Sequence, residues 1–195
     1  MKNKLFLLYI LFCFFFSNTL NAKSFELEAQ SIDIFENGNL VKAKDGKGVS
    51  LDKDIEINAK ELEYQKTSGI LKANKKGSIL IFSKNLKIEF DNATIDEFNS
   101  IISASGNVII SKKDIGLTIN SDTIKYNQNT AEIEIDGSVK VIHLPENLLF
   151  EINNDLLKLK KLKFKDTENN TLETSIAFLN TETNNLYGKD VILNL

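Results

Sequence analysis

The chain has 195 residues and is poor in the residue types that many chemistries require, with one His, one Cys, one Met, one Pro and no Trp. A structural zinc site takes about four Cys or His ligands and a disulfide framework takes at least two Cys, so this composition excludes both. All 24 basic residues are Lys, against 27 acidic residues. A net charge of −3 without Arg argues against a nucleic-acid-binding protein.

Residues 1–22 have the pattern of a secretory signal peptide. Lys2 and Lys4 precede an unbroken apolar run at 5–16, and the polar stretch that follows ends in the small residue Ala22. We expect cleavage after Ala22. The apolar run is shorter than the roughly 20 residues that a membrane-spanning helix needs, which makes a permanent anchor the less favoured alternative.

The remaining residues, 23–195, are interpreted as one domain. Cys13 lies inside the apolar run behind the bulky Phe12, which disfavours a lipoprotein signal, so we expect it to be removed with the leader. Loss of the leader changes the net charge from −3 to −5 and leaves no thiol, in keeping with export to an oxidising compartment. A domain of this size buries enough surface to fold without cross-links.

The exported part alternates between apolar and polar residues, which predicts antiparallel strands with one dry and one wet face. This alternation is found, in chain order, at 55–59, 86–90, 117–119, 133–135, 139–141, 148–152 and 191–195. Six dipeptides carry turn signals: Asn37-Gly38, Asp45-Gly46, Ser68-Gly69, Lys76-Gly77, Gly106-Asn107 and Asp136-Gly137. Residues 154–165 are ambiguous, because their Leu spacing fits a short amphipathic helix and their Lys/Leu alternation fits a strand.

A repeat of about 30 residues underlies the alternation. Its frame is apolar-x-small-x-x-apolar-x-(apolar or Tyr), and it begins at Leu27, Ile57, Phe90, Ile119 and, more weakly, Ile152. Within the frame, the alternation of inward-facing and outward-facing side chains shifts by one residue. This shift predicts a bulge or corner that bends each strand. A second half-motif, Gly-x-apolar-x-apolar, begins at Gly77, Gly106 and Gly137.

Two copies carry a family resemblance. Ala59-x-x-Leu62-x-Tyr64 leads to Gly77-x-Ile79, and Ser121-x-x-Ile124-x-Tyr126 leads to Gly137-x-Val139. These motifs resemble the organic-solvent-tolerance (OstA-like) family of lipopolysaccharide-transport proteins, which includes LptA-type bridge proteins and the N-terminal periplasmic domain of LptD-type assembly proteins. The resemblance covers 25–141. Residues 142–195 contain weaker copies, and Glu97 breaks the third copy.

The resemblance implies an all-β fold, an antiparallel open β-jellyroll with a V-shaped section. It also implies a non-enzymatic periplasmic module that holds lipopolysaccharide acyl chains in an apolar trough and delivers lipopolysaccharide to the outer membrane. The implied partners are lipopolysaccharide, other β-jellyroll transport proteins joined by edge-strand pairing, and an outer-membrane barrel. No cofactor, metal or nucleic acid is expected.

Six inward positions are candidates for the trough lining, and ordinary core packing is the alternative reading of each. They are Ile57, Ile88, Phe90, Ile119, Ile135 and Val141.

Other polar groups are interpreted as structural. His143 lacks the partners of a catalytic set or a metal site. Acid pairs two residues apart, such as Glu26/Glu28, Asp52/Asp54, Glu61/Glu63 and Glu132/Glu134, belong on a wet strand face, although a glycosidase pair is the alternative. The Lys cluster at 158–165 is read as a solvated face, with an anionic-lipid contact as the alternative.

Two competing functions remain at this level. A structural β-solenoid or surface adhesin-like segment without lipid cargo would also repeat, but its strands would be parallel. An enzyme would require titrating groups that converge in a pocket. No catalytic residue is assigned.

Overall fold

The computed structural model describes residues 25–143, 150–152, 171–189 and 191–194. The expected leader at 1–22, the ambiguous segment at 154–165, the Lys cluster at 158–165 and most of the repeat copy that begins at Ile152 lie outside the described residues. Within the described residues, the regular elements are β-strands and two short 3₁₀ turns.

One twelve-stranded sheet contains all the strands of the described residues. The strands are β1 Phe25–Phe35, β2 Leu40–Ser50, β3 Ile55–Gln65, β4 Ile70–Ile81, β5 Leu86–Asp96, β6 Ile101–Lys112, β7 Leu117–Asn127, β8 Glu132–His143, β9 Phe150–Ile152, β10 Thr171–Asn180, β11 Leu186–Lys189 and β12 Ile192–Asn194. The turns are η1 Glu36–Gly38 and η2 Phe82–Lys84. Strands β1 to β8 are neighbours in chain order, and β10, β11 and β9 follow, while β12 pairs with β10.

Every pairing is antiparallel except that of β9 with β11, which is parallel. The structure therefore confirms the all-β, antiparallel open sheet. A solenoid rung would pair neighbouring strands in parallel, so the ladder from β1 to β8 disfavours that alternative.

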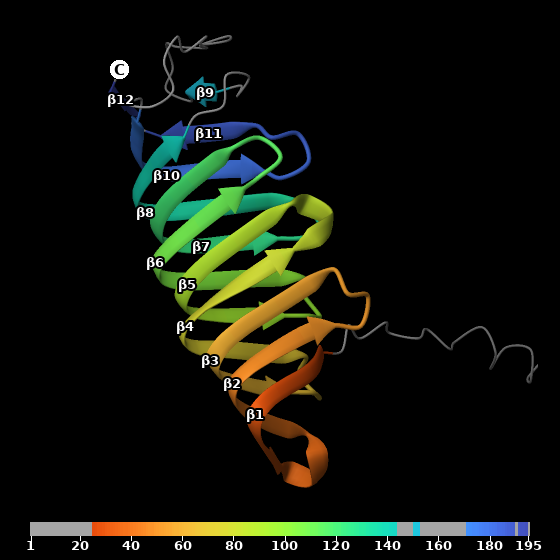
Figure 1. Cartoon of the computed structure of the whole chain (residues 1–195). Coiled ribbons are helices and arrows are strands. Elements are labelled where there is room, and N and C mark those ends of the chain that lie inside the picture. Colours follow the sequence, from red (N-terminus) through yellow and green to blue (C-terminus); the bar gives the residue numbers. More distant parts are fainter. Residues whose placement is uncertain (1–24, 144–149, 153–170, 190, 195) are drawn as a thin grey trace, which may run out of the picture.

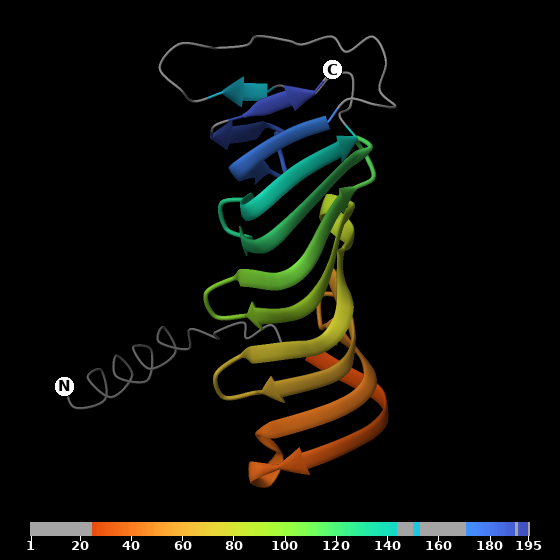
Figure 2. The same cartoon turned by 90° about the vertical axis from the view of Figure 1, so that its left-hand side faces the viewer.

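Each long strand bends near its middle, and the bends stack along one side of the molecule (Figure 1). The predicted phase shift is visible in β3, where Ile55, Ile57 and Ala59 are buried before the bend and Leu62 and Tyr64 after it. The β3–β4 register shifts between Ala59 and Glu61, and comparable shifts interrupt the following pairs up to β8–β10. The extra residue turns the strand, as a bulge does, and the curved strands are seen from this side in Figure 2.

Four of the six turn signals lie at these bends and not between strands. Asn37-Gly38 and Ser68-Gly69 do occupy connections. Asp45-Gly46, Lys76-Gly77, Gly106-Asn107 and Asp136-Gly137 lie inside strands, so their prediction as turns was wrong. A bulge and a tight turn both use left-handed backbone, and the same residue types supply it. Gly106 and Gly137 have φ of 76° and 75°.

Because each strand doubles back at the bend, its two ends lie on the side away from the bends (Figure 1). The connections at 36–39, 66–69, 97–100, 128–131 and 181–185 form what we call the first loop edge. The connections at 51–54, 82–85 and 113–116 form the second loop edge.

Backbone hydrogen bonds between successive connections stiffen both loop edges. On the first, Lys66 N–H donates to Asn39 O at 2.9 Å, and on the second, Phe82 N–H donates to Asp54 O at 2.9 Å. Each edge is thus a continuous border of one half of the folded sheet.

The inner faces of the two halves form one apolar core of Ile, Leu, Val, Ala, Phe and Tyr side chains. The core ends at β1, where no further strand covers the inner face in the described part of the chain. Ile32 and Ile34 point inward yet are 43% and 66% exposed. The outer edge of β1 therefore combines an unpaired strand with an uncovered apolar surface.

Candidate functional site

The six predicted trough residues all point into the core. Their side chains are at most 3% exposed. Ile57 lies on β3, Ile88 and Phe90 on β5, and Ile119 on β7. Ile135 and Val141 lie on β8, on opposite sides of its bend.

Strand register joins some of these residues into a continuous aliphatic row that crosses the sheet. Each residue of the row is the direct cross-strand partner of the next: Ile57, Ile79, Ile88, Ile110, Ile119, Val141 and Leu172. Because direct partners on one face are about 5 Å apart, the row is an unbroken apolar strip along the long axis.

Sequence reasoning missed three members of this row, Ile79, Ile110 and Leu172. Ile79 and Ile110 lie in the Gly-x-apolar-x-apolar half-motif, which begins at Gly77 and Gly106. That half-motif could have identified them, had it been interpreted as inward strand and not only as the marker of a turn. Phe90 is the cross-strand partner of Gly77, and a Cβ on this glycine would overlap the Phe90 ring and the carbonyl oxygen of Asn58. Gly77 therefore serves close packing.

The opposite half of the sheet contributes smaller side chains near the bend. Ala73, Ala93 and Ala104 are successive partners through β4, β5 and β6, and all three are buried. Ile135 continues this row through Ile124. The small residues let the two halves approach closely, so protein side chains fill the interior in this structure. A guest in the core would have to displace these packed side chains.

Two charged residues occupy inward positions near the loop edges. Glu97, which breaks the repeat frame, is 8% exposed and accepts a hydrogen bond from the Tyr64 hydroxyl at 3.1 Å. Lys112 is 3% exposed and donates to the carbonyl oxygen of Lys84 at 3.0 Å and to the Asp114 carboxylate at 2.6 Å. Such partners are what a buried charge requires.

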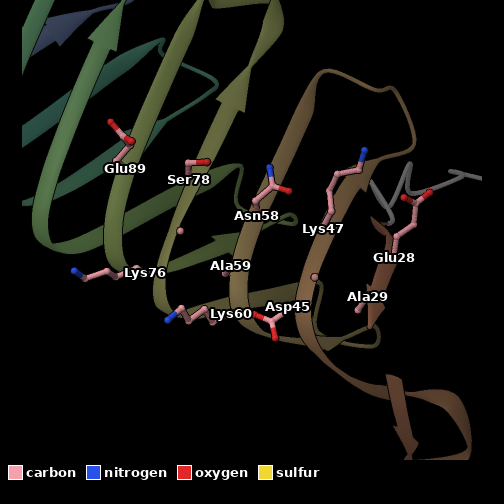
Figure 3. A pocket seen from close by; sticks show the side chains of 12 residues that line it. Glu28, Ala29, Asp45, Lys47, Asn58, Ala59, Lys60, Lys76, Ser78 and Glu89 are labelled. Atoms are coloured by element: carbon pink, nitrogen blue, oxygen red, sulfur yellow. The ribbon is translucent and has the colours of Figure 1, made fainter. Parts of the chain in front are cut away.

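A polar groove of about 670 Å³ lies on the outside of the sheet near the bend of β1 to β5. In Figure 3, Lys60, Lys76 and Asp45 lie along the bend, and Lys47 and Glu89 project from the neighbouring strands. Both acidic and basic groups line this groove, and its lining is distinct from the predicted apolar trough.

Three of the four acid pairs lie on wet strand faces as expected, whereas Asp52 and Asp54 lie in the connection between β2 and β3 and not on a strand. Glu26, Glu28, Glu132 and Glu134 are exposed, and Glu63 forms an ion pair with Lys42 at 2.9 Å. No group of three or more His, Cys, Asp or Glu suited to a metal ion occurs in the described parts of the chain. No helix among the same residues has the length and apolarity to cross a membrane. His143 belongs to β8.

Together, the bent antiparallel strands, the two loop edges and the apolar inner face define an open β-jellyroll of V-shaped section. Comparison of the sequence with protein-family models and with curated proteins gives no match. The structure is similar to a solved one, the crystal structure of LptH, which is the LptA-homologous periplasmic component of the lipopolysaccharide transport device of Pseudomonas aeruginosa. The TM-score is 0.53 at 12% identity, over 72% of this chain and 94% of that chain. The similarity shows that the two proteins share a fold.

Proposed function

We propose that this protein is a non-enzymatic periplasmic module of lipopolysaccharide transport, which holds acyl chains between the two halves of its sheet. The observation that carries the proposal is the aliphatic row from Ile57 to Leu172, in a fold shared with a lipopolysaccharide-transport component. Each acyl methylene that leaves water contributes about 0.8 kcal/mol. Several chains can therefore be held without any catalytic group.

The route to the outer membrane requires a partner at the end of the jellyroll. Strand β1 has one paired side, toward β2, and its inner residues Ile32 and Ile34 are exposed. A strand of another β-jellyroll could add to this edge through main-chain hydrogen bonds and cover these side chains. We propose this edge as the contact with neighbouring transport proteins.

A periplasmic location follows from the proposed leader at 1–22, and the mass of the exported chain tests it. Cleavage after Ala22 gives a chain that begins at Lys23. A mass that retains the apolar run would contradict cleavage there.

Photo-crosslinking tests the cargo. Phe90→p-benzoylphenylalanine places the reactive ketone in the core, at a position that is already aromatic. The matched control is p-benzoylphenylalanine in place of Glu89, whose side chain points outward. With purified lipopolysaccharide under illumination, we expect an adduct at position 90 and none, or much less, at 89. Equal labelling or no adduct at 90 contradicts the proposed cargo.

A further inference from the structure

The closed interior raises the question of where a guest enters, and the inference that follows rests on the proposed function. The two halves are joined at the bend by continuous backbone, because every long strand passes through it. That side can act as a hinge but cannot separate. The opposite side, where the first and second loop edges face each other, is what we call the seam.

Side-chain contacts hold the seam. At the N-terminal end, Phe25 lies beside the second loop edge and Tyr64 beside the first, and their rings meet edge to face with centroids 6.2 Å apart. Both side chains are buried. Such an aromatic contact belongs to the core and closes this end of the seam.

Further along, an ion pair crosses the seam between residues 98 positions apart in sequence. Lys84, in η2 on the second loop edge, contacts Glu182 on the first loop edge with an Nζ–Oε1 distance of 2.9 Å. The Glu182 side chain is 64% exposed. Unlike the aromatic pair, this contact faces solvent, so it can break without exposing apolar surface of its own.

Neighbouring groups keep Lys84 in position. The buried Lys112 ammonium donates to the Lys84 carbonyl oxygen at 3.0 Å. The preceding residue, Ser83, donates from its N–H to Asp54 Oδ1 at 2.7 Å and from its hydroxyl to Oδ2 at 2.8 Å. The second loop edge is therefore preorganised around Lys84, and the exposed Glu182 side chain meets it from the first loop edge.

We propose that the seam is the lateral entrance for fatty acyl chains, and that the Lys84–Glu182 ion pair is the contact that closes it. When the pair separates, the loop edges part about the hinge at the bends and expose the row that includes Ile88 and Ile110. Entry at the uncovered β1 end is the competing route. It differs in requiring no separation of the edges.

A covalent lock distinguishes the two routes. The locked protein carries Lys84→Cys and Glu182→Cys in a Cys13→Ser background, and a short bismaleimide links its two new cysteines. The control is Lys42→Cys with Glu63→Cys, an ion pair of the same 2.9 Å length that joins β2 to β3 within one half of the sheet. Circular dichroism and thermal melting establish that both bridged proteins are folded. The probe is the fluorescent fatty acid cis-parinaric acid.

We expect the unbridged proteins and the bridged control to take up the probe, and the protein bridged across the seam to lose most of its uptake. Equal uptake by both bridged proteins overturns the lateral entrance and leaves the proposed function intact. Failure of the unbridged, folded protein to bind the probe overturns the proposed function, and the entrance with it.

Charge reversal gives a second test without a cross-linker. Lys84→Glu replaces the attraction with repulsion, and we expect uptake of the probe to become about two- to fivefold faster, in keeping with the modest strength of an exposed pair. Lys84→Glu combined with Glu182→Lys restores the original rate. An unchanged rate in the single variant contradicts the role of the ion pair.

Discussion

Asp91 lies so close to Gly106 that a Cβ on this glycine would be 2.8 Å from the Asp91 oxygen Oδ2 and 2.9 Å from the Asp91 Cβ. Asp91 is held there because its Oδ2 accepts a hydrogen bond from Asn107 Nδ2 at 2.7 Å. The next repeat has the same arrangement, with Asp122 against Gly137. An acidic residue on one strand and a left-handed glycine on its neighbour thus pack together at successive bends.

Gly106→Ala is expected to destabilise the fold by about 2–3 kcal/mol, because it combines left-handed strain with a steric conflict. Urea unfolding measures this loss. Gly116→Ala is the matched control, since Gly116 also has a positive φ of 66° but a Cβ added to it would meet nothing within 4 Å. The control should lose about 1 kcal/mol, for strain alone. Equal losses would show that the Asp91 contact has no effect.

Lys76→Gly is expected to stabilise the protein by about 0.5–1 kcal/mol. Lys76 is exposed and has a φ of 69°, a conformation that costs a residue with a Cβ about 1 kcal/mol or more and costs glycine almost nothing. Lys72→Gly, at an exposed position of β4 without positive φ, should instead be destabilising. The midpoint of urea unfolding measures both, and a loss of stability in Lys76→Gly would contradict the strain argument.

Asn99→Ala is expected to lower stability at neutral pH by less than about 1 kcal/mol, because the hydrogen bonds between Asn99 and the half-buried Asp96 are exposed to solvent. Asn99 Nδ2 donates to Asp96 Oδ2 at 2.7 Å, and the Asn99 backbone N–H donates to Oδ1 at 3.0 Å. These bonds, with the side-chain bond first, lower the pKa of Asp96 from its usual 3.8. A lowered folded-state pKa stabilises the protein above the unfolded pKa, and this contribution is lost as the pH falls through the folded pKa.

The difference between Asn99→Ala and the unaltered protein should therefore shrink below about pH 4. Asn127 ends β7 as Asp96 ends β5, and it precedes the next connection of the first loop edge. Its Oδ1 accepts hydrogen bonds from the N–H groups of Asn129 and Thr130. Asn127 carries no titrating carboxylate, so the deficit of Asn127→Ala should not follow this acid transition. Unfolding free energies measured from about pH 7 to about pH 3 check both.

Ile34→Lys is expected to weaken the self-association of this chain through β1 at least about tenfold. About 1.4 kcal/mol corresponds to a factor of ten in the association constant, and burying an Ile side chain is worth more than that. The stability of the single chain should hardly change, because Ile34 is already 66% exposed. Phe98→Lys is the control, at an exposed apolar residue of the first loop edge away from β1. Sedimentation velocity as a function of concentration measures the association, and an equal effect of both variants would exclude a specific role of β1.

Local sequence patterns were sufficient to predict the bent strands. The spacing Ala59-x-x-Leu62 carries the phase shift, because side chains alternate strictly along a strand and only an extra residue returns the next apolar group to the inside. The same patterns could not distinguish a bulge from a turn. Asp136-Gly137 supplies left-handed backbone for either, and strand pairing on both sides of it decides which one forms.

The sequence by itself determined that the strands are antiparallel ribbons with one apolar side, because hydrophobic periodicity is a local property. Only the tertiary structure decided which residues form one row, such as Ile79 between Ile57 and Ile88, since register depends on partners that are distant in sequence. It also decided that Lys84 meets Glu182 across the seam and that the inward side chains of the described residues pack into one buried core. Contacts over such distances arise from the way the sheet folds onto itself, which no local pattern encodes.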